Sequence, residues 1–257
     1  MKTVGIDVGF DTIKIAVMVD GKLVAKARGE TGIIGREDNI DKLFAEALAA
    51  AGLSPADIDK TIATGIGKFN VKFAADHVSD AIALSKAAKH FSKDAACVVD
   101  IGADKTNVVT LDGDGIKEIV LNQKCMAGLG LGLDVMSHRL GYTLDEVGAF
   151  QPEADKGTFV NDGCPVFAEL DSLEELNKGT PKEQVMGAVI NAVIVRLSSI
   201  MRDKVMPDSK NTVLFGGVSC NMAVVNGLKK RTGIDFIIPE DSVYGAAIGC
   251  ALAGAVG

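Results

Sequence analysis

The chain opens with Thr3-Val4-Gly5-Ile6-Asp7-Val8-Gly9, an apolar strand that ends in Asp-x-Gly. The same pattern returns as Cys97-Val98-Val99-Asp100-Ile101-Gly102, and the two aspartates are 100 − 7 = 93 residues apart. At the same offset, a second β-rich run over 13–17 matches another over 106–110, and an Asp-Gly turn follows each. A duplicated β-hairpin with an acidic turn predicts two homologous halves that face a cleft.

Helical patterns separate the strands. Apolar residues recur at helical spacing over about 39–51, 78–90, 127–140 and 181–205, and short β-rich runs occupy 211–215 and 235–238. Because strands and helices interleave along the chain, the sequence predicts an α/β fold with mixed β-sheets flanked by helices.

Composition excludes several classes of protein. The 257 residues carry a net charge of −7, which argues against nonspecific binding to nucleic acid or to an anionic membrane. No signal peptide is visible at the N-terminus, and the apolar stretch 243–256 is too short to span a bilayer, so we expect a cytoplasmic protein. The 5 cysteines form no paired framework. Three of them lie in apolar patterns typical of small buried side chains: Cys97, Cys220 and Cys250.

The two Asp-x-Gly turns suit the phosphates of a nucleotide. Gly9 and Gly102 let the β- and γ-phosphates approach backbone N–H groups closely. The carboxylates of Asp7 and Asp100 would act through Mg²⁺ and bound water, because bare carboxylates repel phosphate. Lys14 lies three residues beyond Asp11 and could neutralise phosphate charge.

Two further glycine turns bear on this prediction. Gly216-Gly217 lies after a strand and before a helix, which suits the nucleoside end of the ligand. The segment Thr64-Gly65-Ile66-Gly67 allows either a plain strand-to-loop turn or a phosphate-facing role. Asp76 and Asp80 flank the start of the following helix, where we expect capping or surface roles.

Two other cysteines lie in polar turns. Cys125 precedes glycines at every second position, namely Gly128, Gly130 and Gly132, and a helix pattern follows. Cys164 is followed by a proline that suits the first turn of a helix. A thiolate at a helix N-terminus is suited to ligate metal, whereas a buried structural cysteine in a glycine-rich turn is the alternative.

The order of these motifs resembles the actin, Hsp70 and sugar kinase superfamily, and more narrowly the iron–sulfur ATPases within it. Asn122-Gln123-Lys124-Cys125-Met126-Ala127-Gly128-Leu129-Gly130 is similar to the Asn-Asp-Lys-Cys-Ala-Ala-Gly-Thr-Gly motif of that family. Cys164-Pro165-Val166-Phe167-Ala168-Glu169 is similar to its Cys-x-Val-Phe-Ala-Glu. The family comprises activators of 2-hydroxyacyl-CoA dehydratases and ATPase subunits of benzoyl-CoA reductase.

The resemblance implies duplicated ribonuclease H-like (actin-like ATPase) domains with ATP in the cleft between them. We expect one subdomain over 1–94 plus 240–257 and a second, with the cluster cysteines, over 95–239. The resemblance also implies that Cys125 and Cys164 ligate a 4Fe–4S cluster shared with a second ATPase subunit, which is paralogous or identical. It further implies that Gly128 and Gly130 line the cofactor sites. ATP hydrolysis to ADP, with Mg²⁺, would drive a strongly reducing electron from reduced ferredoxin or flavodoxin to an acyl-CoA reductase or dehydratase. The helix that follows Cys125 would connect the cluster to the second phosphate hairpin through 117–120.

The chain departs from the family's phosphate motifs. Phe10 and Asp11 stand where the first motif usually has Ser and Thr, and Thr12 is the candidate to replace the lost hydroxyl. In the second motif Ala103 replaces a glycine, and Asp104 is the candidate to orient the attacking water. This divergence favours a benzoyl-CoA reductase-type subunit, with a homodimeric dehydratase activator as the alternative. A small-molecule kinase and a non-catalytic ATP-binding scaffold are more distant alternatives.

Overall fold

The computed structural model describes residues 1–122, 129–150, 158–202 and 211–255. Within it the chain divides into two compact units. The first comprises Met1–Val98, Val109–Ile119 and Pro239–Gly257, and the second comprises Val99–Val108 and Val120–Ile238. The subdomain boundaries expected from the sequence stay a prediction.

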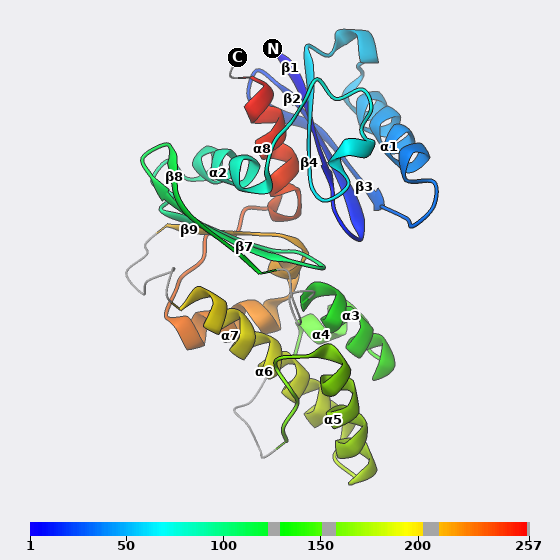
Figure 1. Cartoon of the computed structure of the whole chain (residues 1–257), viewed down its shortest axis with the longest axis vertical. Coiled ribbons are helices and arrows are strands. Elements are labelled where there is room, and N and C mark those ends of the chain that lie inside the picture. Colours follow the sequence, from blue (N-terminus) through cyan, green and yellow to red (C-terminus); the bar gives the residue numbers. More distant parts are fainter. Residues whose placement is uncertain (123–128, 151–157, 203–210, 256–257) are drawn as a thin grey trace. The chain divides into compact units, whose positions relative to one another are not determined.

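The first unit is built on a five-stranded mixed sheet with the strand order β3-β2-β1-β4-β5. Strand β1 pairs with β2 in antiparallel and with β4 in parallel orientation, and in this register Asp7 lies opposite Lys14. Figure 1 shows β1 to β4 as neighbouring strands. The strand bounds are β1 Lys2–Val8, β2 Thr12–Val19, β3 Lys22–Glu30, β4 Lys60–Thr64 and β5 Asp76–His77.

Helices cover both faces of this sheet. Alternation along β1 directs Val4, Ile6 and Val8 into an apolar core with helix α1 (Arg36–Ala51). On the other face lies α8 (Gly245–Gly254), which in turn packs against α2 (Asp80–Phe91). Helix α8 comes so close that a Cβ built at Gly5 would lie 1.8 Å from the carbonyl oxygen of Ala247. This close approach explains why α8 is composed almost entirely of small residues.

The second sheet has the strand order β8-β7-β6-β9 and repeats the first hairpin. Its strands are β6 Cys97–Ile101, β7 Thr106–Asp112, β8 Gly115–Asn122 and β9 Thr212–Phe215. Adding 93 to the bounds of β1, β2 and β3 reproduces β6, β7 and β8 to within two residues at each end. The duplication predicted from the sequence is therefore confirmed.

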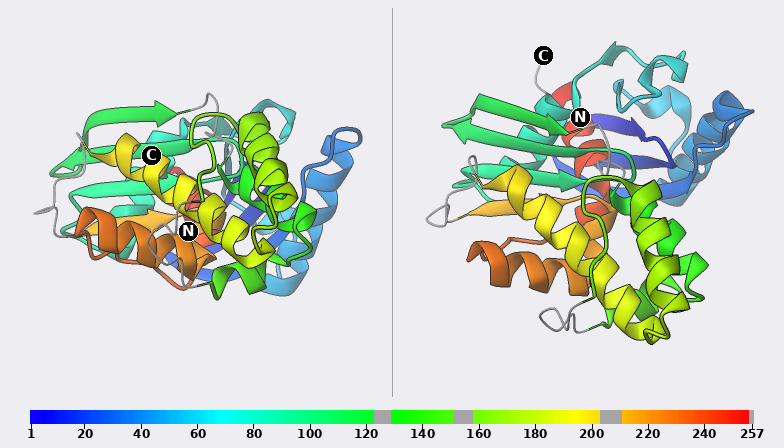
Figure 2. Two further views of the ribbon diagram at one scale, coloured as in Figure 1. Left: turned by 90° about the horizontal axis from the view of Figure 1, so that it is seen from below. Right: turned by 60° about the horizontal axis from the view of Figure 1, so that its bottom comes forward.

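The remaining helices of the second unit pack around α6, which contacts α3, α5 and α7. Figure 2 shows α6, in yellow, beside α7, in orange. Among the described residues, α6 alone is long and apolar enough to cross a membrane, and 56% of that stretch is buried, as in the core helix of a soluble protein. The bounds are α3 Leu129–Arg139, α4 Leu144–Gly148, α5 Pro165–Asn177, α6 Lys182–Met201 and α7 Met222–Thr232.

Short 3₁₀ turns complete the described elements. They are η1 Pro55–Asp57, η2 Lys68–Asn70, η3 Gly217–Cys220 and η4 Ser242–Tyr244. The strand expected at 235–238 is reduced to one parallel bridge, in which Ile237 pairs with Val213. Strands β1, β2, β6 and β7 form as expected, because each buries an alternating or continuous apolar pattern, whereas β3 and β8 form at the sheet edges and are more exposed.

Candidate functional site

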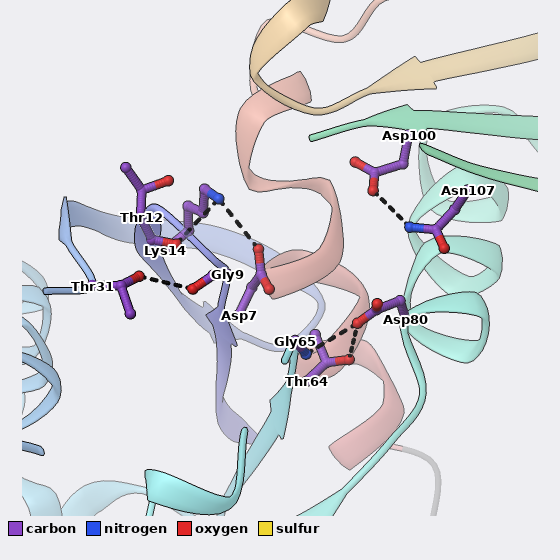
Figure 3. A network of polar contacts seen from close by, with 10 residues as sticks. All are labelled: Asp7, Gly9, Thr12, Lys14, Thr31, Thr64, Gly65, Asp80, Asp100 and Asn107. Carbon is purple, nitrogen blue, oxygen red and sulfur yellow. Dashed lines mark hydrogen bonds and ion pairs between the residues drawn. The ribbon is translucent and has the colours of Figure 1, made fainter. Parts of the chain in front are cut away.

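The first Asp-x-Gly turn joins β1 to β2 and holds a lysine against an aspartate. Gly9 N donates to Thr12 O at 3.1 Å, which closes the turn. Lys14 Nζ donates to Thr12 O at 3.3 Å and lies 3.5 Å from Asp7 Oδ2 (Figure 3). Both charged side chains are largely buried, with exposed fractions of 16% for Lys14 and 15% for Asp7. A Cβ at Gly9 would lie 2.8 Å from Thr12 O, so this turn requires glycine.

A buried threonine, Thr31, holds the first turn by hydrogen bonds to its backbone. Thr31 Oγ1 donates to Gly9 O at 2.9 Å, and Thr31 N donates to Asp11 O at 2.8 Å. Thr31 is fully buried, whereas Phe10 and Asp11 are exposed at the tip. Thr12, the predicted replacement for the lost hydroxyl, starts β2 and is half-buried. The turn is therefore a fixed backbone cradle with an exposed rim.

The second turn has the same geometry. Gly102 N donates to Lys105 O at 2.9 Å, and these atoms are the 93-residue counterparts of Gly9 N and Thr12 O. Asn107 Nδ2 donates to Asp100 Oδ2 at 3.0 Å, so an uncharged amide stands where the first turn has Lys14. Sequence reasoning missed Asn107, although the 93-residue alignment places it at the Lys14 position.

Two residues that the sequence assigned to the second turn lie on it as expected. Ala103 and Asp104 are half-buried between β6 and β7. Ala103 O accepts a hydrogen bond from Leu131 N at 3.1 Å. The role of Asp104 in orienting water stays a prediction.

The start of α3 rests directly on this second turn. Gly130 N donates to Gly102 O at 3.3 Å, in addition to the bond between Leu131 and Ala103. A Cβ at Gly130 would lie 2.7 Å from Gly102 O and 3.0 Å from Ala103 Cα, so the contact requires glycine. Two hydrogen bonds thus join the start of α3 directly to the turn, and the connection through 117–120 stays a prediction. Cys125 and Gly128 themselves lie outside the described residues.

The segment after β4 supports Asp7 from the other side. Gly65 has φ +88°, and a Cβ there would lie 2.6 Å from Asp7 Oδ1 and 2.3 Å from Val8 O. Gly67 N donates to Val8 O at 3.0 Å. The segment therefore lies against the first Asp-x-Gly turn, and both roles that the sequence left open for it stay predictions.

Asp80 holds that segment in place and is not a helix cap. Ser79 caps α2, because its Oγ accepts from Ile82 N at 3.3 Å. Asp80 Oδ1 instead accepts from Thr64 Oγ1 at 2.8 Å and from Gly65 N at 3.0 Å (Figure 3). The capping or surface role expected for Asp80 was wrong, because its side chain turns back toward β4.

The predicted nucleoside turn combines packing with exposure. Gly216 has φ +92°, and a Cβ there would lie 2.3 Å from Ile101 O, so glycine lets β9 lie close to β6. Ser219 Oγ donates to Gly216 O at 2.7 Å. Gly217 is exposed, and a Cβ there would meet no atom within 4 Å. The structure therefore gives Gly216 a packing role and leaves Gly217 open to a ligand.

Cys164 stands at the start of α5 in a fixed loop. Asn161 Oδ1 accepts from Gly163 N at 2.9 Å and from Cys164 N at 2.8 Å, and Asn161 N donates to Asp171 Oδ2 at 2.8 Å. Pro165 occupies the first turn of α5, as predicted. The Cys164 thiol is free and half-buried.

The other described cysteines differ from Cys164. Cys97 and Cys250 are buried as predicted, and burial raises the pKa of the Cys97 thiol to about 12. Burial, followed by the nearby carboxylates of Asp7 and Asp80, raises the pKa of Cys250. The expectation that Cys220 is buried was wrong, since it is exposed at the end of η3.

Helices α3 and α5 are joined by an ion pair, and α5 also exposes apolar side chains. Arg139 Nε on α3 lies 3.3 Å from Glu169 Oε1 on α5, so an ion pair joins the helices that follow the two predicted ligands. Val166, Phe167 and Leu170 of α5 are exposed. In the described ranges, no three His, Cys, Asp or Glu side chains gather as a metal site.

Comparison with known protein sequences gives matches over nearly the whole chain. A model of the BadF/BadG/BcrA/BcrD ATPase family matches residues 4–254. The activator of lactoyl-CoA dehydratase from Anaerotignum propionicum is 31% identical over 256 residues, which cover 98% of this chain and 96% of the relative. One of the subunits of benzoyl-CoA reductase from Thauera aromatica is 26% identical, and the match covers 98% of this chain and 93% of the relative.

Solved structures agree with this result. The crystal structure of (R)-2-hydroxyglutaryl-CoA dehydratase component A from Acidaminococcus fermentans matches with a TM-score of 0.88 and 28% identity, over 98% of this chain and 97% of that chain. The activator of the 2-hydroxyisocaproyl-CoA dehydratase from Clostridium difficile, with bound ADPNP, matches with a TM-score of 0.86 and 26% identity, over 99% and 94%. These likenesses confirm the predicted fold class.

Proposed function

Because the chain belongs to the BadF/BadG/BcrA/BcrD ATPase family, as predicted, we propose that it is an ATP-hydrolysing iron–sulfur protein that activates a 2-hydroxyacyl-CoA dehydratase. The sequence alone favoured a benzoyl-CoA reductase-type subunit. The relatives favour the alternative, because the dehydratase activator is 31% identical and the reductase subunit 26%. The same relatives support a dehydratase or reductase component as the partner.

The observation that carries the ATPase proposal is the matched pair of phosphate turns. In each, a glycine N–H closes on the carbonyl three residues later, at 3.1 Å for Gly9 and 2.9 Å for Gly102. Asp7 and Asp100 stand at the strand ends that lead into these turns, where each would reach Mg²⁺ through bound water. Lys14 would supply the positive charge for the phosphates of ATP and, after hydrolysis, of ADP.

Cys125 and Cys164, with their counterparts in a second ATPase subunit, would hold the 4Fe–4S cluster. When bound, such a cluster supplies a low-potential one-electron carrier. Cys164 suits this role because its thiol is free and half-buried and its backbone is fixed by Asn161. It stands at the N-terminus of the 13-residue helix α5, whose dipole favours a bound anionic cluster. The exposed apolar residues of α5 suit contact with the second subunit.

The remaining partners follow from this chemistry. Reduced ferredoxin or flavodoxin would supply the electron, and the dehydratase would accept it. We place the protein in the cytoplasm, where such carriers work, and we expect neither a nucleic-acid nor a membrane partner. The net charge of −7 supports this, because anionic polymers and surfaces would repel it.

Anaerobic purification tests the proposal. We expect a brown protein with about four irons per two chains, since a 4Fe–4S cluster requires four thiolates. Cys164→Ala should abolish the colour, whereas Cys220→Ala should retain it, because Cys220 is an exposed cysteine outside the predicted ligand set. A colourless parent protein that hydrolyses ATP would refute the iron–sulfur part alone.

Native mass measurement tests the assembly. We expect a dimer of identical chains that, when reduced and supplied with ATP, starts turnover of a 2-hydroxyacyl-CoA dehydratase. Copurification with a paralogous ATPase subunit would instead favour the benzoyl-CoA reductase-type complex. Absence of ATP hydrolysis by the reduced or oxidised dimer would contradict the proposal as a whole.

A further inference from the structure

We propose that Asp80 is a positioning residue for ATP hydrolysis, which acts by fixing the Thr64–Gly65 segment against the carboxylate of Asp7. This inference rests on the proposed ATPase function. It assigns a role to a residue outside both Asp-x-Gly motifs.

The anchor consists of two hydrogen bonds to one oxygen. Thr64 Oγ1 and Gly65 N both donate to Asp80 Oδ1, at 2.8 Å and 3.0 Å. Thr64 is fully buried and Asp80 is half-buried, so these bonds are partly shielded from water. Asp80 is the first residue of α2, where the helix dipole favours a negative charge. One carboxylate oxygen therefore fixes both the side chain at the end of β4 and the backbone of the next residue.

Gly65 transmits this constraint to Asp7. With φ +88°, its α-carbon faces the first turn so closely that a Cβ would lie 2.6 Å from Asp7 Oδ1. The other carboxylate oxygen, Asp7 Oδ2, lies 3.5 Å from Lys14 Nζ. Asp7 is thus bounded by Gly65 on one side and by Lys14 on the other, as Figure 3 shows. A shift of Gly65 would release the carboxylate from its position at the end of β1.

The surroundings make this arrangement rigid. Lys68 Nζ donates to Val78 O at 3.0 Å, which ties the far end of the same loop to the segment before α2. Cys250 of α8 is fully buried, and the pKa of its thiol is raised by burial and by the carboxylates of Asp7 and Asp80. Cys250 therefore forms a buried apolar wall close to both aspartates.

The experiment compares Asp80→Ala with Asp80→Asn in steady-state ATP hydrolysis by the full-length protein. The amide oxygen of asparagine can accept both hydrogen bonds, whereas alanine accepts neither. We expect Asp80→Ala to lower kcat by about tenfold or more, with KM for MgATP changed less than about twofold, because misplaced catalytic groups cost rate more than binding. Asp80→Asn should stay within about threefold of the parent, since positioning requires the acceptor and not the charge.

Asp76→Ala is the matched control. Asp76 lies four residues earlier, is exposed, and its carboxylate accepts a hydrogen bond from the adjacent His77 N. We expect no change in kcat for this variant. If Asp80→Asn is as slow as Asp80→Ala, the charge itself is required and the positioning role is refuted.

A second pair of variants covers the case in which Asp80→Ala does not fold. Thr64→Val removes one donor and nearly keeps the shape, and Thr64→Ser restores the hydroxyl. We expect Thr64→Val to lower kcat and Thr64→Ser to recover it, with both melting cooperatively. A parent protein without ATPase activity would refute the proposed function, whereas an active parent matched by Asp80→Ala and Thr64→Val would refute only this inference.

Discussion

Gly130→Ala tests whether the start of α3 depends on the second Asp-x-Gly turn. The added methyl group would lie 2.7 Å from Gly102 O and 3.0 Å from Ala103 Cα, and all the atoms that it meets are backbone. Ordinary van der Waals contact begins at 3.4 Å, so the helix and the turn must separate by 3.4 − 2.7 = 0.7 Å. That separation stretches the bond from Gly130 N to Gly102 O, which is already 3.3 Å long.

The size of the effect follows from these contacts. Loss of the two hydrogen bonds from α3 to the turn costs about 2 kcal/mol of unfolding free energy, at about 1 kcal/mol each. Alanine in place of glycine returns up to about 1 kcal/mol of helix stability. The net loss is therefore about 1 kcal/mol. Because a displacement of 1 Å in a reacting group costs about 100-fold in rate, a shift of 0.7 Å in the turn should lower kcat for ATP by about ten- to fiftyfold.

Gly132→Ala is the control, because a Cβ at Gly132 meets no atom within 4 Å. Gly132 lies on the same helix two residues after Gly130. The Gly132→Ala variant should gain up to about 1 kcal/mol of unfolding free energy, with kcat unchanged. Urea unfolding and steady-state ATP hydrolysis measure both quantities for both variants. Equal kcat values and equal unfolding free energies of the two variants would refute a role for the contact between α3 and the second Asp-x-Gly turn.

Two further perturbations probe the cysteines. Asn161→Ala removes the acceptor that fixes the backbone of Cys164, so the lifetime of the cluster against an iron chelator should fall by about tenfold. Asn177→Ala, at an exposed position, should leave this lifetime unchanged. Equal lifetimes of the two variants would contradict the role of Asn161. The folded state raises the pKa of Cys97 from 9.0 to about 12, so its contribution to stability is complete below pH 9 and is lost as the pH rises toward 12. Between pH 8 and pH 10 the parent should lose about 1.4 kcal/mol of unfolding free energy relative to Cys97→Ala, as measured by urea unfolding, and parallel curves would argue against the shift.

The repeated hairpin is the part of the fold that the sequence alone predicted in most detail. The 93-residue offset predicted the strands β6, β7 and β8 and the correspondence of Asp7 with Asp100. These features depend on local patterns, because strand alternation and the Asp-x-Gly turn are properties of consecutive residues. The motif around Cys164 likewise predicted a proline in the first turn of α5.

The contacts between distant segments were decided only by the tertiary structure. Nothing in the spacing of Asp80 indicates that its carboxylate turns back to Thr64 and Gly65, and a first-turn aspartate is equally typical of a surface helix. The sequence placed Gly130 in a glycine-rich stretch expected to line a cofactor site, whereas the structure shows that glycine is required there because the α3 backbone lies against the Gly102 turn. Local patterns determine which elements form, whereas the roles of Asp80 and Gly130 come from close packing between elements that are far apart in the chain.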